Sequence, residues 1–110
     1  MPDLPLVVLE LEPMASGHRS LRLTRGVSWE GFDAYATAVV AALRGTVEHR
    51  ADSPAERVWS VTIDGAPFWL SFDDFALGVS LDPCDAVADA RIDEILLRLR
   101  GLGPGTSSQP

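Results

Sequence analysis

Three aspartates that stand at turns of the chain are the residues best suited to form a small acidic site. Asp64 precedes Gly65, and Asp73 and Asp74 follow Phe72. Carboxylate oxygens are ligands that a divalent cation prefers. Adjacent side chains of an extended chain point to opposite faces, so Asp73 and Asp74 would share one site only if a turn bent them together. The alternative is that each aspartate bonds its own backbone within a turn, and we expect no metal site.

Cys84, His18 and His49 are the other side chains that could ligate a metal or form a nucleophilic pair. A zinc site needs three or four ligands, usually with short paired spacings, whereas these three positions are far apart in the sequence. A helix N-terminus can lower the pKa of a thiol and activate it, but Asp82 and Asp85 flank Cys84 and disfavour the thiolate. The chain also lacks the glycine patterns of a nucleophile elbow, a phosphate-binding loop or a dinucleotide site. We therefore expect a protein that is not an enzyme and has no cofactor.

The charge of the chain narrows the classes of partner. It has 110 residues with 16 acids against 9 bases, all of them arginine, and a formal net charge of −7. A nucleic-acid-binding surface needs a basic footprint, and an anionic membrane surface attracts basic segments. Both partners are therefore disfavoured, whereas a basic protein partner suits this charge.

The location of the protein is inferred from its cysteine content and its first residues. Cys84 is the only cysteine, so no disulfide can form within the chain. The first residues lack the basic segment of a signal peptide, and the apolar run 6–9 is too short to cross a membrane. We expect a cytoplasmic protein.

The candidate residues must be positioned by a mixed fold. Residues 6–11 and 19–24 have the composition of a strand pair. A helix is expected next, with Ser28 as its N-cap and Gly45 as its left-handed C-terminal stop. Its expected buried stripe follows helical spacing. The stripe consists of Phe32, Tyr35, Ala36, Val39, Val40 and Leu43.

The second half of the chain reads as four strands, 46–50, 57–63, 67–72 and 77–81, followed by a helix. Asp64-Gly65 is a strong hairpin signal. The helix is expected to start at Asp82-Pro83, with Asp85 as the acid of a capping box. Its expected buried residues are Ala88, Ile92, Ile95, Leu96 and Leu99. We predict one α+β domain over 1–101, with an antiparallel sheet of about six strands in the order ββαββββα and both helices on one face. Residues 102–110 are expected to be a disordered tail.

Three tryptophans, Trp29, Trp59 and Trp69, are the most informative aromatic residues. Trp59 should face the core with Val61 and Ile63. Trp69 has the opposite parity to Phe68, Leu70 and Phe72, so it should point to the other face of the sheet. An exposed tryptophan there would be a natural anchor for an interface, unless another part of the chain covers it.

The segment Phe68–Phe75, followed by Gly78–Leu81, resembles strand–turn–strand segments of small uncharacterised bacterial α+β proteins. These include some immunity proteins of polymorphic toxin systems. The resemblance covers about a fifth of the chain and carries no catalytic motif. It implies a protein that binds and neutralises one cognate toxin, and it transfers no site residues.

The sequence thus favours a non-enzymatic protein-binding module, an immunity-type inhibitor whose acidic surface meets a basic toxin. The residues expected at its interface are Trp69, Asp64, Asp73 and Asp74. One alternative is a small housekeeping or regulatory adaptor that forms a homodimer through the open side of the sheet. Another is a small-ligand binder or cryptic enzyme that uses Cys84 or the aspartates. Whether the chain is a monomer or a homodimer stays open.

Overall fold

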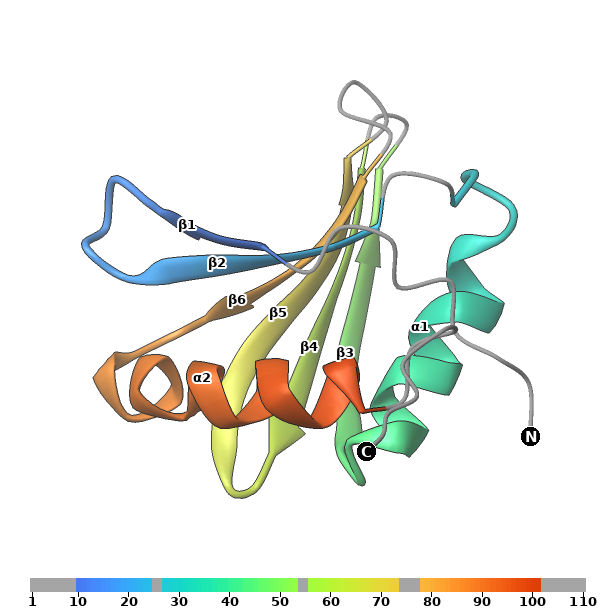
Figure 1. Cartoon of the computed structure of the whole chain (residues 1–110). Helices are drawn as coiled ribbons and strands as arrows, with labels where there is room; N and C mark the ends of the chain where they lie inside the picture. The colour runs from blue at the N-terminus through green and yellow to red at the C-terminus, as the bar shows by residue number, and fades with distance from the viewer. Residues whose placement is uncertain (1–9, 25–26, 54–55, 74–77, 102–110) are drawn as a thin grey trace.

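The computed structural model describes residues 10–24, 27–53, 56–73 and 78–101, and its elements follow the predicted order ββαββββα (Figure 1). The strands are β1 (Glu10–Pro13), β2 (Arg19–Thr24), β3 (Thr46–Asp52), β4 (Glu56–Ile63), β5 (Ala66–Asp73) and β6 (Gly78–Pro83). The helices are α1 (Phe32–Ala42) and α2 (Ala86–Arg100). Residues 6–9 of the first expected strand, Asp74, Leu77 and the tail 102–110 lie outside the described residues.

All six strands form one antiparallel sheet in the order β1-β2-β6-β5-β4-β3. The first hairpin therefore joins the main sheet, because β2 pairs with β6, the last strand of the chain. Strands β3, β4, β5 and β6 lie side by side in chain order and form a meander. The two edge strands of the sheet are β1 and β3. Figure 1 shows that the sheet is strongly twisted, with the β1–β2 hairpin turned well away from the direction of β3.

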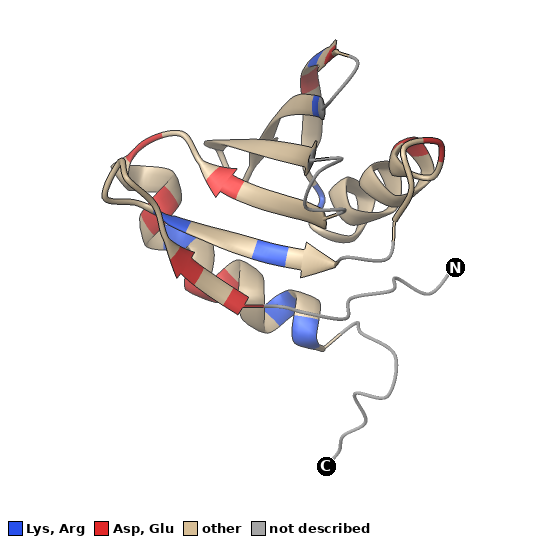
Figure 2. Cartoon of the chain, turned by 90° about the horizontal axis from the view of Figure 1, so that it is seen from above, with Lys and Arg blue, Asp and Glu red and all other residues tan. Residues whose placement is uncertain are grey.

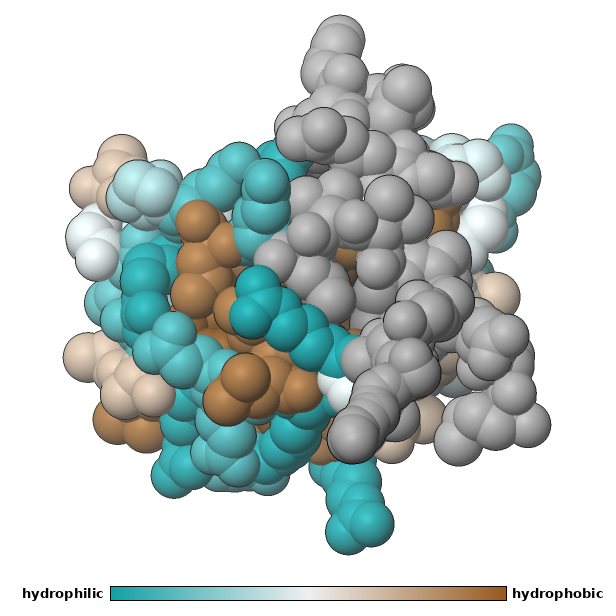
Figure 3. Space-filling model, viewed as in Figure 1, coloured by the Kyte–Doolittle hydropathy of each residue, from teal (hydrophilic) through white to brown (hydrophobic). Residues whose placement is uncertain are grey.

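Both helices lie on the same face of the sheet, which is the core face. Helix α2 contacts β2, β5 and β6, and α1 contacts β3. Phe32 of α1 lies edge-on against Trp59 of β4, with ring centroids 5.3 Å apart, and also contacts Phe72 of β5. Figure 3, in the same view as Figure 1, shows apolar groups near the centre of the molecule with polar groups to their left and below. Every residue of the two helical stripes expected from the sequence is buried, which confirms their assignment.

The alternation of the strands is also confirmed. Trp59, Val61 and Ile63 of β4 are at most 1% exposed, and Phe68, Leu70 and Phe72 of β5 are fully buried. The residues between them point to the opposite side. We call that side the open face, which carries Ser20, Val58, Ser60, Trp69, Ser71 and Asp82.

The start of α1 differs from the expected one. The helix begins at Phe32 after Gly31, which makes no side-chain cap. Ser28 instead accepts a hydrogen bond from the backbone N–H of Gly31 through its hydroxyl, at 3.1 Å. The expected N-cap therefore stabilises a turn that precedes the helix, as a serine can do outside a helix.

The end of α1 also corrects the prediction. Arg44, not Gly45, takes the left-handed conformation, with a φ of 56°. Gly45 is required for a different reason, because a Cβ there would lie 2.8 Å from the carbonyl oxygen of Thr62. The chain passes directly over β4 at this point, and only glycine allows so close an approach.

Helix α2 begins later than predicted. Asp85 is its N-cap, and the carboxylate accepts a hydrogen bond from the backbone N–H of Ala88 at 2.9 Å. Asp82 and Pro83, which were expected to start the helix, are the last residues of β6. They pair with Trp69 and Phe68 of β5. This places the Asp82 side chain on the open face rather than at a helix end.

The turn between β4 and β5 confirms the hairpin signal of the sequence. Asp64 and Gly65 both have positive φ, 54° and 77°. This is the backbone that a two-residue type I′ turn requires. The turn fixes the register of the hairpin, which pairs Ile63 with Ala66 and Ser60 with Trp69.

Candidate functional site

Trp69 lies at the middle of β5, near the centre of the sheet, and its side chain is on the open face. The residue is 49% exposed, whereas Phe68 and Leu70 on either side are fully buried. Its neighbours across the strands are Ser60 of β4 and Asp82 of β6. Small polar side chains flank the indole, so it stands above its surroundings. The predicted orientation of Trp69 is thus confirmed, and it forms an apolar projection on a polar surface.

A row of residues crosses the whole open face at the level of Trp69. From one edge strand to the other, the register runs His49, Ser60, Trp69, Asp82, Ser20 and Glu12. Side chains directly opposite each other on neighbouring strands have Cβ atoms about 5 Å apart. The sheet thereby brings together positions from all parts of the chain.

Asp82 is a partly buried titratable group of this row. The hydroxyl of Ser20 donates a hydrogen bond to its carboxylate, and Ser20 itself is only 9% exposed. Burial raises the pKa of Asp82, while the hydrogen bonds from Ser20 and Ser80 and the charge of Arg22 act in the opposite direction. A carboxylate has acceptor sites for more than two hydrogen bonds, so further donors can bind it.

The open face is acidic in the described part of the chain. Glu10 and Glu12 of β1 lie opposite Arg22 and Ser20 of β2, and Figure 2 shows the acids of β1 beside the arginines of β2. Glu48 of β3 accepts a hydrogen bond from the hydroxyl of Thr62 at 3.0 Å. With Asp82, these acids outnumber the single arginine of this face, Arg22.

Two of the aspartates that the sequence placed at an interface, Asp64 and Asp73, are far apart along β5. Asp64 lies in the turn before β5, whereas Asp73 ends that strand. The strand between them spans about 25 Å at 3.3 Å a residue, with Trp69 in between. Asp64 forms an ion pair with Arg98 of α2, which ties the hairpin to the helix. Nothing in the structure describes Asp74, and only the backbone of Asp73 is described.

The other chemical candidates are also separated. Cys84 comes directly after β6. Burial raises the pKa of its thiol most, and the negative charges of Asp85 and Asp82 raise this pKa further. His49 is exposed on the edge strand β3, and His18 lies in the turn before β2. No three His, Cys, Asp or Glu residues of the described ranges are grouped as metal ligands would be. Neither described helix has the length and apolar character needed to cross a membrane.

Ion pairs on the rim of the core use three arginines. Arg19 pairs with Asp89 and Asp93, and Arg98 pairs with Asp64 and Glu94. The third, Arg57, bridges Asp33 of α1 and Asp52 of β3, and it also donates to the carbonyl oxygen of Trp29 at 3.0 Å. These networks join the helices to the sheet, so we assign them to the fold.

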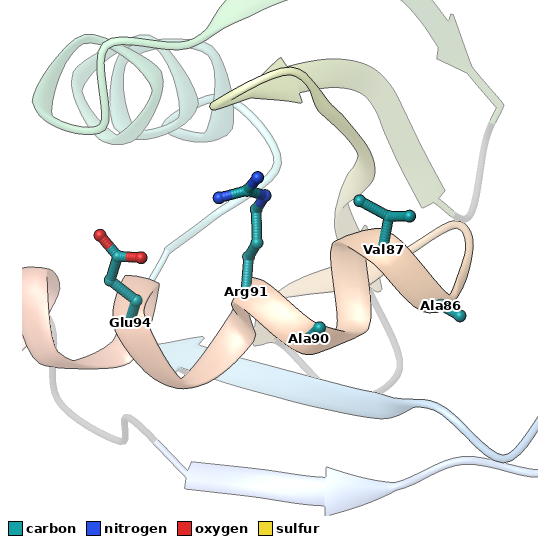
Figure 4. A pocket seen from close by; sticks show the side chains of 5 residues that line it. All are labelled: Ala86, Val87, Ala90, Arg91 and Glu94. Carbon is teal, nitrogen blue, oxygen red and sulfur yellow. The ribbon is translucent and has the colours of Figure 1, made fainter.

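A shallow hollow of about 500 Å³ runs along α2. Its described lining comes from this helix alone, namely Ala86, Val87, Ala90, Arg91 and Glu94. Figure 4 shows the side chains of Val87, Arg91 and Glu94 projecting from the same side of the helix. Because a single helix supplies them, they do not converge on a common point from different directions, as the polar groups of a ligand site do.

A family model described as "Protein of unknown function (DUF3630)" matches residues 9–100. The chain belongs to this family. The DUF3630 match covers every helix and strand of the structure, including the positions of Trp69 and Asp82. A search of curated proteins and a search of solved structures each found no match.

Asp82 is the site residue that the sequence reasoning missed. The signal was present, because Leu81 was correctly placed in the core and the next residue of a strand points the other way. The error came from ending the last strand at Leu81 and assigning Asp82 to the helix. Extending β6 by two residues would have placed this carboxylate beside Trp69.

Proposed function

We propose that this DUF3630 chain is a non-enzymatic protein-binding module that holds its partner on the open face of the sheet. The observation that carries the proposal is the half-exposed Trp69 at the centre of that face. Tryptophan is enriched among the residues that contribute most to binding at protein interfaces. Anchors of this kind lie near the centre of a contact surface and are surrounded by residues that exclude water.

The face of the sheet is better suited to binding than its edges. In the described part of the chain, edge strand β1 has four residues and ends at Pro13, which has no N–H to donate. Edge strand β3 carries the charged residues Glu48, Arg50 and Asp52. Short edges and charged edges both disfavour the addition of another strand. The open face, by contrast, presents a broad area formed by all six strands.

Two observations support the finer assignment to an immunity-type inhibitor of a basic toxin. The net charge of −7 and the acids of the open face suit a basic partner, because complementary charge speeds encounter and selects the right partner. The segment 68–81, which resembles parts of immunity proteins, includes both Trp69 and the β5–β6 hairpin of this face.

The test starts from a tagged chain used to isolate its partner from the native cell lysate, followed by calorimetry with the purified partner. Trp69→Ala should weaken binding about 30-fold or more, because an interface anchor contributes about 2 kcal/mol or more. The matched control is Leu97→Ala, since Leu97 is 65% exposed on α2, away from the open face. That variant should bind normally.

An unchanged affinity for Trp69→Ala, with the fold intact by circular dichroism, would remove the proposal. Sedimentation of the isolated chain distinguishes the homodimeric adaptor. If a stable dimer forms and Trp69→Ala dissociates it, the open face is the contact between two copies and the adaptor replaces the inhibitor as the function.

A further inference from the structure

The residues beside the indole of Trp69 indicate which chemical group of the partner would bind there. Trp69 and Asp82 are directly paired across β5 and β6, so an aromatic face and a carboxylate lie about 5 Å apart at their Cβ atoms. An aromatic face attracts a cation through its quadrupole, and the carboxylate attracts the same cation. We propose that Trp69 and Asp82 form a subsite for an arginine side chain of the partner protein. This inference rests on the proposed function.

Asp82 differs from Asp64 and Asp89 in its charged partners. Asp89 and Asp64 each have an arginine within ion-pairing distance, whereas Asp82 forms no ion pair with any residue of the described ranges. Its hydrogen-bond donors are serines. Removing a carboxylate from water without a counter-ion costs free energy. A cation supplied by a partner would add a direct ion pair to the longer-range attraction of Arg22.

The chain itself contains an example of arginine stacked on tryptophan in this sheet. Arg50 of β3 is paired in register with Trp59 of β4, and its guanidinium lies 4.3 Å from the centre of the indole ring. Trp69 occupies the equivalent central position on the open face, but its cross-strand neighbours are Ser60 and Asp82. Among the residues that the structure describes, no arginine lies over this indole, so an arginine of a partner can stack there.

Arginine fits the pair better than other cations. Its planar guanidinium can stack on an aromatic ring while its N–H groups donate to a carboxylate in the same plane. On the side of Asp82 away from Trp69, the row continues with Ser20 and Glu12. Their oxygens can accept hydrogen bonds from a bound guanidinium, and neither side chain is a cation that would compete with it. Arg22, the one arginine of this face among the described residues, lies opposite Glu10, so a carboxylate faces it too.

The probe is the blocked pentapeptide Gly-Gly-Arg-Gly-Gly, compared with the same peptide carrying citrulline, which keeps the shape and loses the charge. Binding to the full chain is followed by ¹H–¹⁵N NMR. We expect millimolar binding of the arginine peptide, with shifts at the Trp69 indole N–H and the backbone amides of Ser80 and Asp82. The citrulline peptide should bind about tenfold more weakly, or not measurably.

Asp82→Asn tests the carboxylate while keeping its size. It should weaken the arginine peptide about five- to tenfold and leave the citrulline peptide unchanged. The matched control is Glu30→Gln, which removes one negative charge at an exposed position before α1 and should have no effect. Thermal unfolding of both variants checks that each retains its fold.

Equal binding of the arginine and citrulline peptides would overturn the subsite, as would full binding by Asp82→Asn. Either result would leave the proposed function standing if Trp69→Ala still lost the purified partner. Shifts at Trp69 that depend on protein concentration, without peptide, would show a second copy on the open face and would also overturn the inference. Loss of partner binding in Asp82→Asn but not in Glu30→Gln would extend the result to the natural complex.

Discussion

Replacing Arg57 by methionine should destabilise the fold substantially, because this arginine links α1, β3 and β4. Arg57 is 9% exposed. Its guanidinium donates to Asp33 at 2.6 Å, to Asp52 at 3.1 and 3.2 Å, and to the carbonyl oxygen of Trp29. It also lies 5.1 Å from the centre of the Trp29 ring. Methionine preserves most of the apolar stem and removes all of these interactions.

The expected loss can be worked out from the exposure of each partner. The side chains of Asp33 and Asp52 are 58% and 40% exposed, so water can replace the arginine and each ion pair contributes about 0.5 kcal/mol. The hydrogen bond to the Trp29 carbonyl contributes about 1 kcal/mol, and stacking on aromatic rings contributes about 0.5 kcal/mol more. The total is about 2.5 kcal/mol, which corresponds to a fall in Tm of about 10 °C or more for a domain of this size.

Thermal unfolding followed by circular dichroism measures this effect. Arg91→Met is the matched control, because Arg91 is exposed on α2 and forms no ion pair with another described residue. Its Tm should stay within about 2 °C of the wild-type value. If Arg57→Met also unfolds within that margin, the reasoning that treats Arg57 as the link between α1 and the sheet is refuted.

Two further predictions concern the start of α2. Asp85→Ala removes the N-cap and should reduce the free energy of unfolding by about 1 kcal/mol, whereas Asp85→Ser keeps an acceptor and should restore most of the lost Tm in the same melting experiment. Burial and the charges of Asp85 and Asp82 raise the pKa of the Cys84 thiol. Iodoacetamide should therefore label Cys84 more slowly than a free thiol near pH 7, and the rate should rise as the pH increases. Rapid and selective labelling at pH 7 would instead favour a nucleophilic cysteine and a cryptic enzyme.

The sequence was sufficient to predict the layers of the fold because burial repeats with the period of each element. The stripe of α1 and the alternation of β4 and β5 are each one-dimensional patterns, and every residue that they assign to the core is buried. The turn at Asp64-Gly65 was predictable for a similar reason, since its conformation depends on two adjacent residues.

The ends of the elements could not be predicted, because distant contacts decide them. Asp82 and Asp85 are both good N-caps in isolation, and the structure uses Asp85 because β5 holds Asp82 and Pro83 in the sheet. Ser28 caps a turn rather than α1, and Gly45 is needed because the chain passes close to Thr62. Asp64 and Asp73 lie a strand length apart, at opposite ends of β5, so the alternative of a shared acidic site does not apply to this pair.

The position of Asp82 suggests that part of the stability of the fold is given up for recognition. Burial raises the pKa of this carboxyl in the folded chain. Between the pKa of the unfolded chain and the raised folded pKa, the folded state therefore binds more protons, and stability falls as the pH rises through this window. At pH values above this window, the folded state bears the full free-energy cost of burying the charged carboxylate. Asp82→Asn should accordingly be at least as stable as the wild type at pH 7, while its binding to an arginine peptide falls. A residue needed only for folding would lose stability instead, so the opposite signs of the two effects separate a binding role for Asp82 from a structural one.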